Sequence, residues 1–161
     1  MKRWAPVLLA AAALRLLGCI PAGTDVAELL PVQAVCIAYT RGAVSVRTDG
    51  GLLAEGATLE QALEKAELAA EGVLFFSTAE HVILLPGAQR LARQLPAQTR
   101  LRPAAKVYLA RGQVDPETAA RYLDAHAGTL TIARLQAALE TGTDAAIPIL
   151  RVHEGGLLLE P

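Results

Sequence analysis

Apolar residues fall into short runs along most of the chain, and polar stretches rich in glycine or proline separate the runs. The runs between residues 33 and 55 contain many β-branched residues and flank two turn sequences, Arg41-Gly42 and Asp49-Gly50-Gly51. This pattern predicts an antiparallel meander of three strands. The predicted strands cover residues 33–39, 43–48 and 52–55.

The clearest helical pattern starts at Thr58. Thr58 followed by Gln61 matches a capping box, and apolar residues then recur every three or four positions as far as Gly72. Strands and helices interleave further along the chain without a regular βαβ period. We therefore expect a single α+β domain with helices packed on a mixed β-sheet. The remaining elements are expected as strands at residues 73–77, 81–85, 105–111, 147–152 and 157–159, and as helices at residues 88–94, 116–126 and 129–141.

The N-terminus has the pattern of an export signal. Lys2 and Arg3 precede an apolar run from Ala5 to Leu14 that is shorter than the roughly 20 residues of a membrane-spanning helix. The run leads into Leu-x-Gly-Cys, which resembles the lipobox of bacterial lipoproteins and implies that Cys19 carries a diacylglycerol. Arg15 interrupts the apolar stretch. An uncleaved anchor and an ordinary secretory signal are therefore the alternatives.

These features predict the organisation of the chain. We expect a lipoprotein signal peptide at residues 1–18, a tether at residues 19–31 and one domain at residues 32–161, a length that fits a single core. Without residues 1–18 the chain has 12 basic and 16 acidic residues, a net charge of −4. This charge argues against nucleic acid as a partner.

Groups that could carry out catalysis or bind metal are sparse. Neither serine, Ser45 or Ser77, stands in a Gly-x-Ser-x-Gly elbow. The three histidines lie on separate predicted elements without metal-ligand spacing, and each is interpreted as an ordinary surface or edge residue. They are His81, His126 and His153. Cys36 lies in an apolar run and is expected to be a buried, inert thiol. We predict no catalytic residue, no cofactor and no metal site.

Charged residues show the more informative pattern. Four glutamates step by 4, 3 and 4 positions along the predicted helix, so they form one acidic stripe that only Lys65 offsets. Residues 81–114 contain no acid and several basic side chains. The stripe and the basic segment could contact each other, a protein partner, anionic lipid or only solvent. The candidate partner contacts are Glu60, Glu64, Glu67, Glu71, Arg90, Arg93, Arg100 and Arg102.

Several segments also stand in a recognisable order. The lipobox is followed by Asp25-x-x-Glu28-Leu29, by a helix that begins within residues 56–63, and by two apolar stretches at residues 74–76 and 81–85. Residues 106–112 and 146–150 complete the series. This order resembles the first domain of the spore germination lipoprotein family, Ger(x)C, the C subunit of nutrient germinant receptors. Family members are more than twice as long and commonly have Trp-Asp after the lipid-bearing cysteine, where this chain has Ile20-Pro21.

The resemblance implies a non-enzymatic lipoprotein that acts in spore germination beside polytopic membrane subunits. It implies a location on the extracytoplasmic face of a membrane, namely the spore inner membrane. The alternative function is an extracytoplasmic lipoprotein that binds a ligand or peptide and is unrelated to spores.

Overall fold

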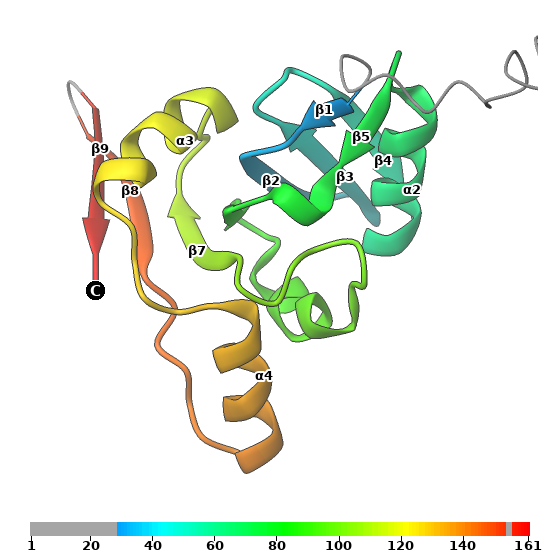
Figure 1. The fold of residues 1–161 in the computed structure, drawn as a ribbon. Helices are drawn as coiled ribbons and strands as arrows, with labels where there is room; N and C mark the ends of the chain where they lie inside the picture. The colour runs from blue at the N-terminus through cyan, green and yellow to red at the C-terminus, as the bar shows by residue number, and fades with distance from the viewer. Residues whose placement is uncertain (1–28, 154–155) are drawn as a thin grey trace, which may run out of the picture.

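A computed structural model describes residues 29–153 and 156–161. The predicted signal peptide, Cys19 and residues 20–28 of the tether lie outside this part of the chain. The described residues form an α+β domain with a mixed sheet and helices on it, as the sequence predicts (Figure 1). Its strands are β1 (Leu29–Pro31), β2 (Ala34–Thr40), β3 (Ala43–Thr48), β4 (Leu53–Gly56), β5 (Val73–Phe75), β6 (His81–Leu84), β7 (Lys106–Arg111), β8 (Ile149–His153) and β9 (Gly156–Glu160).

Each α-helix of the described residues follows a residue whose side chain accepts a hydrogen bond from a free backbone N–H group of that helix. The hydroxyl of Thr58 accepts a 3.2 Å hydrogen bond from the backbone N–H of Gln61, and Asp115 and Thr131 cap later helices in the same way. Gly142 ends the last helix in the left-handed conformation, at φ 68°. The helices are α2 (Leu59–Ala69), α3 (Pro116–Ala125) and α4 (Ile132–Thr141), with short 3₁₀ segments η2 (Phe76–Thr78) and η3 (Gln89–Ala97).

Seven strands form the main sheet in the order β4-β3-β2-β6-β7-β8-β9. The predicted meander forms the antiparallel edge β4-β3-β2, where Arg41 and Gly42 turn with φ of 53° and 88°. Strands β2, β6, β7 and β8 run parallel, and β9 returns antiparallel beside β8. Strands β1 and β5 pair in parallel as a separate two-stranded sheet.

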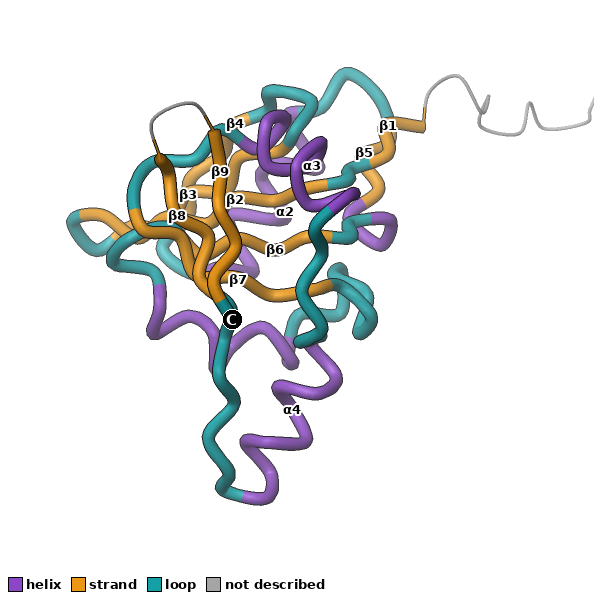
Figure 2. The backbone as a smooth tube through the Cα atoms, turned by 90° about the vertical axis from the view of Figure 1, so that its left-hand side faces the viewer, coloured by secondary structure: helices purple, strands orange, loops and turns teal. Residues whose placement is uncertain are grey.

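Alternate residues of the central strands face two different cores. Helices α2 and α4 and segment η3 cover one face, where Val35, Ile37 and Val82 are buried. Helix α3 covers the other face, where Cys36 and Tyr108 are buried (Figure 2). The central strands therefore read as continuous apolar runs because both of their faces are covered.

Four predictions need correction. The strand expected at residues 73–77 ends at Phe75, because Phe76 and Ser77 belong to the 3₁₀ helix η2. The tether does not extend to residue 31, because Leu29–Pro31 form β1, a strand that is too short to show periodicity and depends on β5 for its pairing. The helix expected at residues 88–94 is present as the 3₁₀ helix η3, but it continues to Ala97 with Pro96 inside it instead of ending before that proline. The helix expected at residues 129–141 begins at Ile132, after its cap.

Within the two described ranges, no helix combines the length and the apolar composition that crossing a membrane requires.

Candidate docking site

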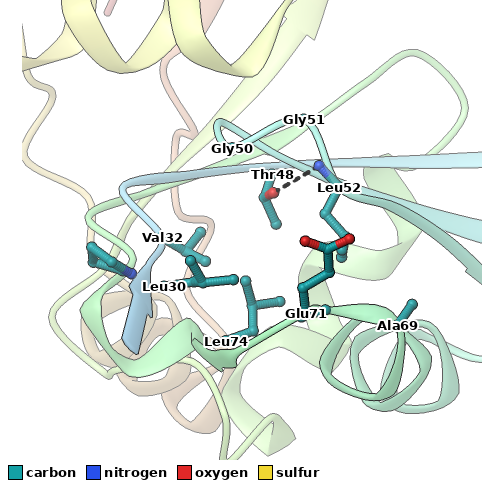
Figure 3. A pocket seen from close by; sticks show the side chains of 11 residues that line it. Leu30, Val32, Thr48, Gly50, Gly51, Leu52, Ala69, Glu71 and Leu74 are labelled. Atoms are coloured by element: carbon teal, nitrogen blue, oxygen red, sulfur yellow. Dashed lines mark hydrogen bonds between the residues drawn. The ribbon is translucent and has the colours of Figure 1, made fainter. Parts of the chain in front are cut away.

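A hollow lies beside β1, where the described part of the chain begins. It has a volume of about 440 Å³, and its walls come from β1, from the turn between β3 and β4, and from the segment that joins α2 to β5 (Figure 3). Leu30, Val32, Leu52 and Leu74 provide the apolar lining. Such a volume lies within the usual range of ligand pockets and would also accept one or two side chains of a partner.

A tight turn forms the upper wall of this cavity. The backbone N–H of Gly51 donates to the carbonyl oxygen of Thr48 at 3.0 Å, and Gly51 has a φ of 81° that favours glycine. The Thr48 hydroxyl accepts from the backbone N–H of Leu52 at 3.3 Å, as Figure 3 shows. Asp49 accepts from the backbone N–H of Gln33 at 3.1 Å. These bonds hold the turn against the end of β1.

The opposite wall is the two-stranded sheet. Leu30 of β1 stands opposite Leu74 of β5 in the register, and both side chains line the cavity. Val73 and Phe75 alternate with Leu74, and their exposed fractions of 43% and 41% show that they remain in solvent. In the described part of the chain each of the two strands pairs only with the other, so each has an open edge. Open strand edges beside apolar side chains favour addition of an extended segment.

The polar contribution to the site is small. Glu71 lines the cavity and its carboxylate faces the turn that begins at Thr48 (Figure 3). Thr78 fixes the backbone just after β1, because its hydroxyl accepts from the backbone N–H of Val32 at 3.0 Å. The site therefore has few groups that could carry out chemistry, and its main property is exposed apolar area.

Several of the predicted partner contacts have partners inside the chain. Arg100 forms a 2.9 Å ion pair with Glu67, and this hydrogen bond is the main reason why the pKa of the Arg100 guanidinium is raised. Arg102 lies 3.3 Å from Glu80, a residue of the loop before β6. The guanidinium of Arg90 lies 3.5 Å from the centre of the Tyr39 ring.

The remaining predicted contacts lie apart from one another. Glu60 and Glu64 are exposed on α2, whereas Glu71 lies beyond the end of that helix at the cavity. Arg93 lines a different hollow, beside the end of α4 at Gly142. The basic segment and the acidic stripe thus meet at Glu67, and the structure does not gather all eight residues in one place.

The structure contradicts the prediction for one histidine and agrees with the predictions for the other two and for Cys36. The interpretation of His81 as a surface or edge residue is wrong, because it is fully buried and burial lowers its pKa. The apolar run that begins at His81 predicts a strand, but no local pattern indicates that helix α3 covers this end of β6. His126 is exposed and stacks on Tyr122, and His153 is exposed. Cys36 is buried as predicted, and burial, followed by the charge of Asp115, raises its pKa to about 12.

Sequence reasoning did not find the cavity. Leu30 falls in the predicted tether and Leu52 in a predicted strand, and no pattern in the sequence connects them with Leu74. Only the apolar residues at the end of the supposed tether could have indicated a contact surface. Comparisons with protein-family models, curated proteins and solved structures find no match. The likeness to germination lipoproteins therefore rests on the segments quoted above.

Proposed function

We propose that this chain is a membrane-anchored lipoprotein that works by assembling with membrane subunits and not by catalysis. In this proposal Cys19 carries the lipid, and the domain serves as a subunit like that of a nutrient germinant receptor in spore germination. Its site of action is the extracytoplasmic face of a membrane, the spore inner membrane in this case. The partner is a polytopic membrane subunit.

The short sequence separation between Cys19 and the cavity is the observation that carries the proposal. Leu29, the first residue of β1, stands ten residues after Cys19 in the sequence. Ten residues span at most about 36 Å when fully extended. A lipid on Cys19 would therefore keep the cavity and the open strand edges close to the membrane surface, where a polytopic subunit presents its extracytoplasmic loops.

The chemistry of the surface defines what would bind there. Three of the exposed large apolar residues, Leu30, Val73 and Phe75, belong to the two-stranded sheet. Each would lose much of its remaining exposed area if an extended apolar segment of the membrane subunit added to an open edge. Burying such area is favourable by about 25 cal/mol per Å². We therefore assign the docking contact to the β1–β5 sheet and the adjoining cavity.

The test separates anchoring from docking. The chain and its variants are expressed in sporulating cells, and detergent extracts are analysed for co-purified membrane proteins. The double variant Val73→Lys/Phe75→Lys should stay in the membrane fraction but recover the polytopic subunit at least about tenfold less, since two charges would face an apolar partner. Leu158→Lys, at a residue 46% exposed on β9 far from this sheet, is the control and should leave recovery unchanged.

Either of two results would contradict the proposal. Equal recovery of the partner by the double variant and the control would place the docking contact elsewhere. A wild-type chain that co-purifies with no polytopic subunit, from spores that contain the protein, would remove the assembly role itself. Cys19→Ala is expected to release the domain from the membrane without changing its fold.

A second function is favoured by the volume of the cavity. At about 440 Å³ it could hold a small apolar ligand without any protein partner. An extracytoplasmic binding lipoprotein unrelated to spores is therefore the alternative. A ligand that raises the melting temperature of the isolated wild-type chain, and fails to do so after Leu74→Phe fills the cavity, would favour this alternative.

A further inference from the structure

Three possible metal ligands converge at the end of the sheet where β6 begins. Glu80 immediately precedes β6, His81 is the first residue of that strand, and Asp124 approaches from α3. One nitrogen or oxygen atom of each side chain lies within 4.8 Å of the corresponding atoms of the other two. The two carboxylate side chains are each 47% exposed, whereas the His81 side chain is 1% exposed. The three side chains thus combine one buried imidazole with two carboxylates that solvent can reach.

The imidazole of His81 has an unusual feature. Its Nε2 atom is buried and has no hydrogen-bond partner among the described residues. The closest carboxylate oxygen, Oδ1 of Asp124, is 3.5 Å away, which is longer than a well-formed hydrogen bond. A buried polar atom without a partner costs about 1–3 kcal/mol and calls for an explanation.

We infer that Glu80, His81 and Asp124 form a binding site for a first-row divalent cation of the Zn²⁺ type. Zn²⁺ bonds to nitrogen and oxygen ligands are about 2.0–2.2 Å long, so two ligand atoms of a tetrahedral site lie about 3.4 Å apart. The 3.5 Å between Nε2 of His81 and Oδ1 of Asp124 matches this separation. An imidazole with two carboxylates suits Zn²⁺ better than Mg²⁺, which requires mainly oxygen ligands.

Neighbouring polar groups orient His81 and Asp124. Nδ1 of His81 lies 3.3 Å from the Tyr108 hydroxyl, and that hydroxyl also accepts from the backbone N–H of Gly128 at 3.1 Å. In the tautomer with its proton on Nδ1, His81 donates to Tyr108 and directs the lone pair of Nε2 toward the site. The side-chain amide of Gln33 donates to both oxygens of Asp124 at 2.8 Å. Such outer contacts commonly fix metal ligands in place.

Two basic residues compete with a cation at this site. Arg102 lies 3.3 Å from Glu80, so Glu80 must release this contact or share its second oxygen with the metal. Lys106 is the partner of His81 in the register of β6 and β7. We therefore expect Glu80 to be the weakest of the three ligands and Asp124 and His81 to contribute most of the affinity. Water would complete the coordination.

A bound cation would tie α3 to the start of β6. His81 and Asp124 lie 43 positions apart in the sequence, so the metal would add a long-range link on the face of the sheet that α3 covers. This inference does not depend on the proposed docking function, because the site is not part of the cavity lining.

The test compares Zn²⁺ binding between matched variants. The full chain, purified in detergent and freed of metal with a chelator, is titrated with Zn²⁺ in a calorimeter, and its melting temperature is measured with and without Zn²⁺. Asp124→Asn removes a ligand at an exposed position and should weaken Zn²⁺ binding at least about tenfold and abolish the metal-dependent rise in melting temperature. Glu117→Gln removes one negative charge from the same helix, is exposed, and should behave like the wild type.

A second variant separates the loss of a metal ligand from a folding defect. Glu80→Gln changes another exposed side chain and should weaken binding less than Asp124→Asn does, with the metal-free melting temperature of each variant reporting its folding. The inference is overturned if the wild-type chain shows no saturable binding of Zn²⁺. It is also overturned if Asp124→Asn and Glu117→Gln bind Zn²⁺ equally, or if Mg²⁺ binds as tightly as Zn²⁺ does.

Discussion

Reversing the charge of Glu67 should destabilise the domain, whereas the same change one turn earlier should not. Nε of Arg100 lies 2.9 Å from Oε2 of Glu67, and the two side chains are 29% and 34% exposed. Glu64 and Glu60 also act on Arg100 through their charges, but neither forms an ion pair with it among the described residues. Glu64→Lys is therefore a matched control for Glu67→Lys, with the same substitution on the same helix.

The expected magnitude follows from the exposure of the pair. A partly exposed ion pair contributes about 0.5–1 kcal/mol after screening by solvent, and a lysine facing Arg100 adds repulsion of similar size. Glu67→Lys should therefore cost about 1–2 kcal/mol, whereas Glu64→Lys should stay within about 0.5 kcal/mol of the wild type. At about 4 °C per kcal/mol the first variant should lose about 4–8 °C of melting temperature.

Thermal unfolding followed by circular dichroism measures both variants, at low and at high salt. High salt should reduce the difference between them, since the interaction is electrostatic and partly exposed. Equal melting temperatures for Glu64→Lys and Glu67→Lys would refute the reasoning. That result would mean that the Arg100 contact does not persist in solution and that the whole acidic stripe is free to meet a partner.

Three further predictions concern the fold. In the Cys19→Ala chain, Cys36 should resist thiol reagents at neutral pH and react only on unfolding, because burial and a raised pKa of about 12 keep the thiol protonated. The ordinary pKa of a cysteine thiol is about 9, so the free energy of unfolding should fall as pH rises from about 9 toward 12. Rapid labelling of the native protein would contradict this. Gly56→Ala should cost about 1–3 kcal/mol in urea unfolding, since a Cβ there would lie 2.6 Å from the backbone nitrogen of Ala62, and an unchanged midpoint would show that α2 moves easily. Asp115→Ala should cost about 1 kcal/mol at pH 7 by removing the cap of α3. Hydrogen bonds from Thr118 lower the pKa of Asp115, so the loss of unfolding free energy in Asp115→Ala should be complete above about pH 4 and should fade as pH falls through the lowered pKa. A loss that does not change with pH would contradict the capping role.

The sequence by itself determined the elements whose signals are local. A capping box and a 3.6-residue period are properties of neighbouring residues, so they located the helix that begins after Thr58. The turn sequence Arg41-Gly42 likewise defined the first hairpin. The burial of Cys36 followed from its apolar run. The α+β class followed from the order of these elements.

Tertiary structure alone decided the features that join distant segments. Strand β1 exists because three residues before the main sheet meet β5, more than 40 positions later, and no local pattern carries that information. The cavity beside it has the same origin. His81 became buried because α3 folds over the start of β6, which also brought Asp124 within 3.5 Å of its ring. Periodicity shows which face of an element is apolar, but long-range packing determines which other element covers that face and which side chains meet there.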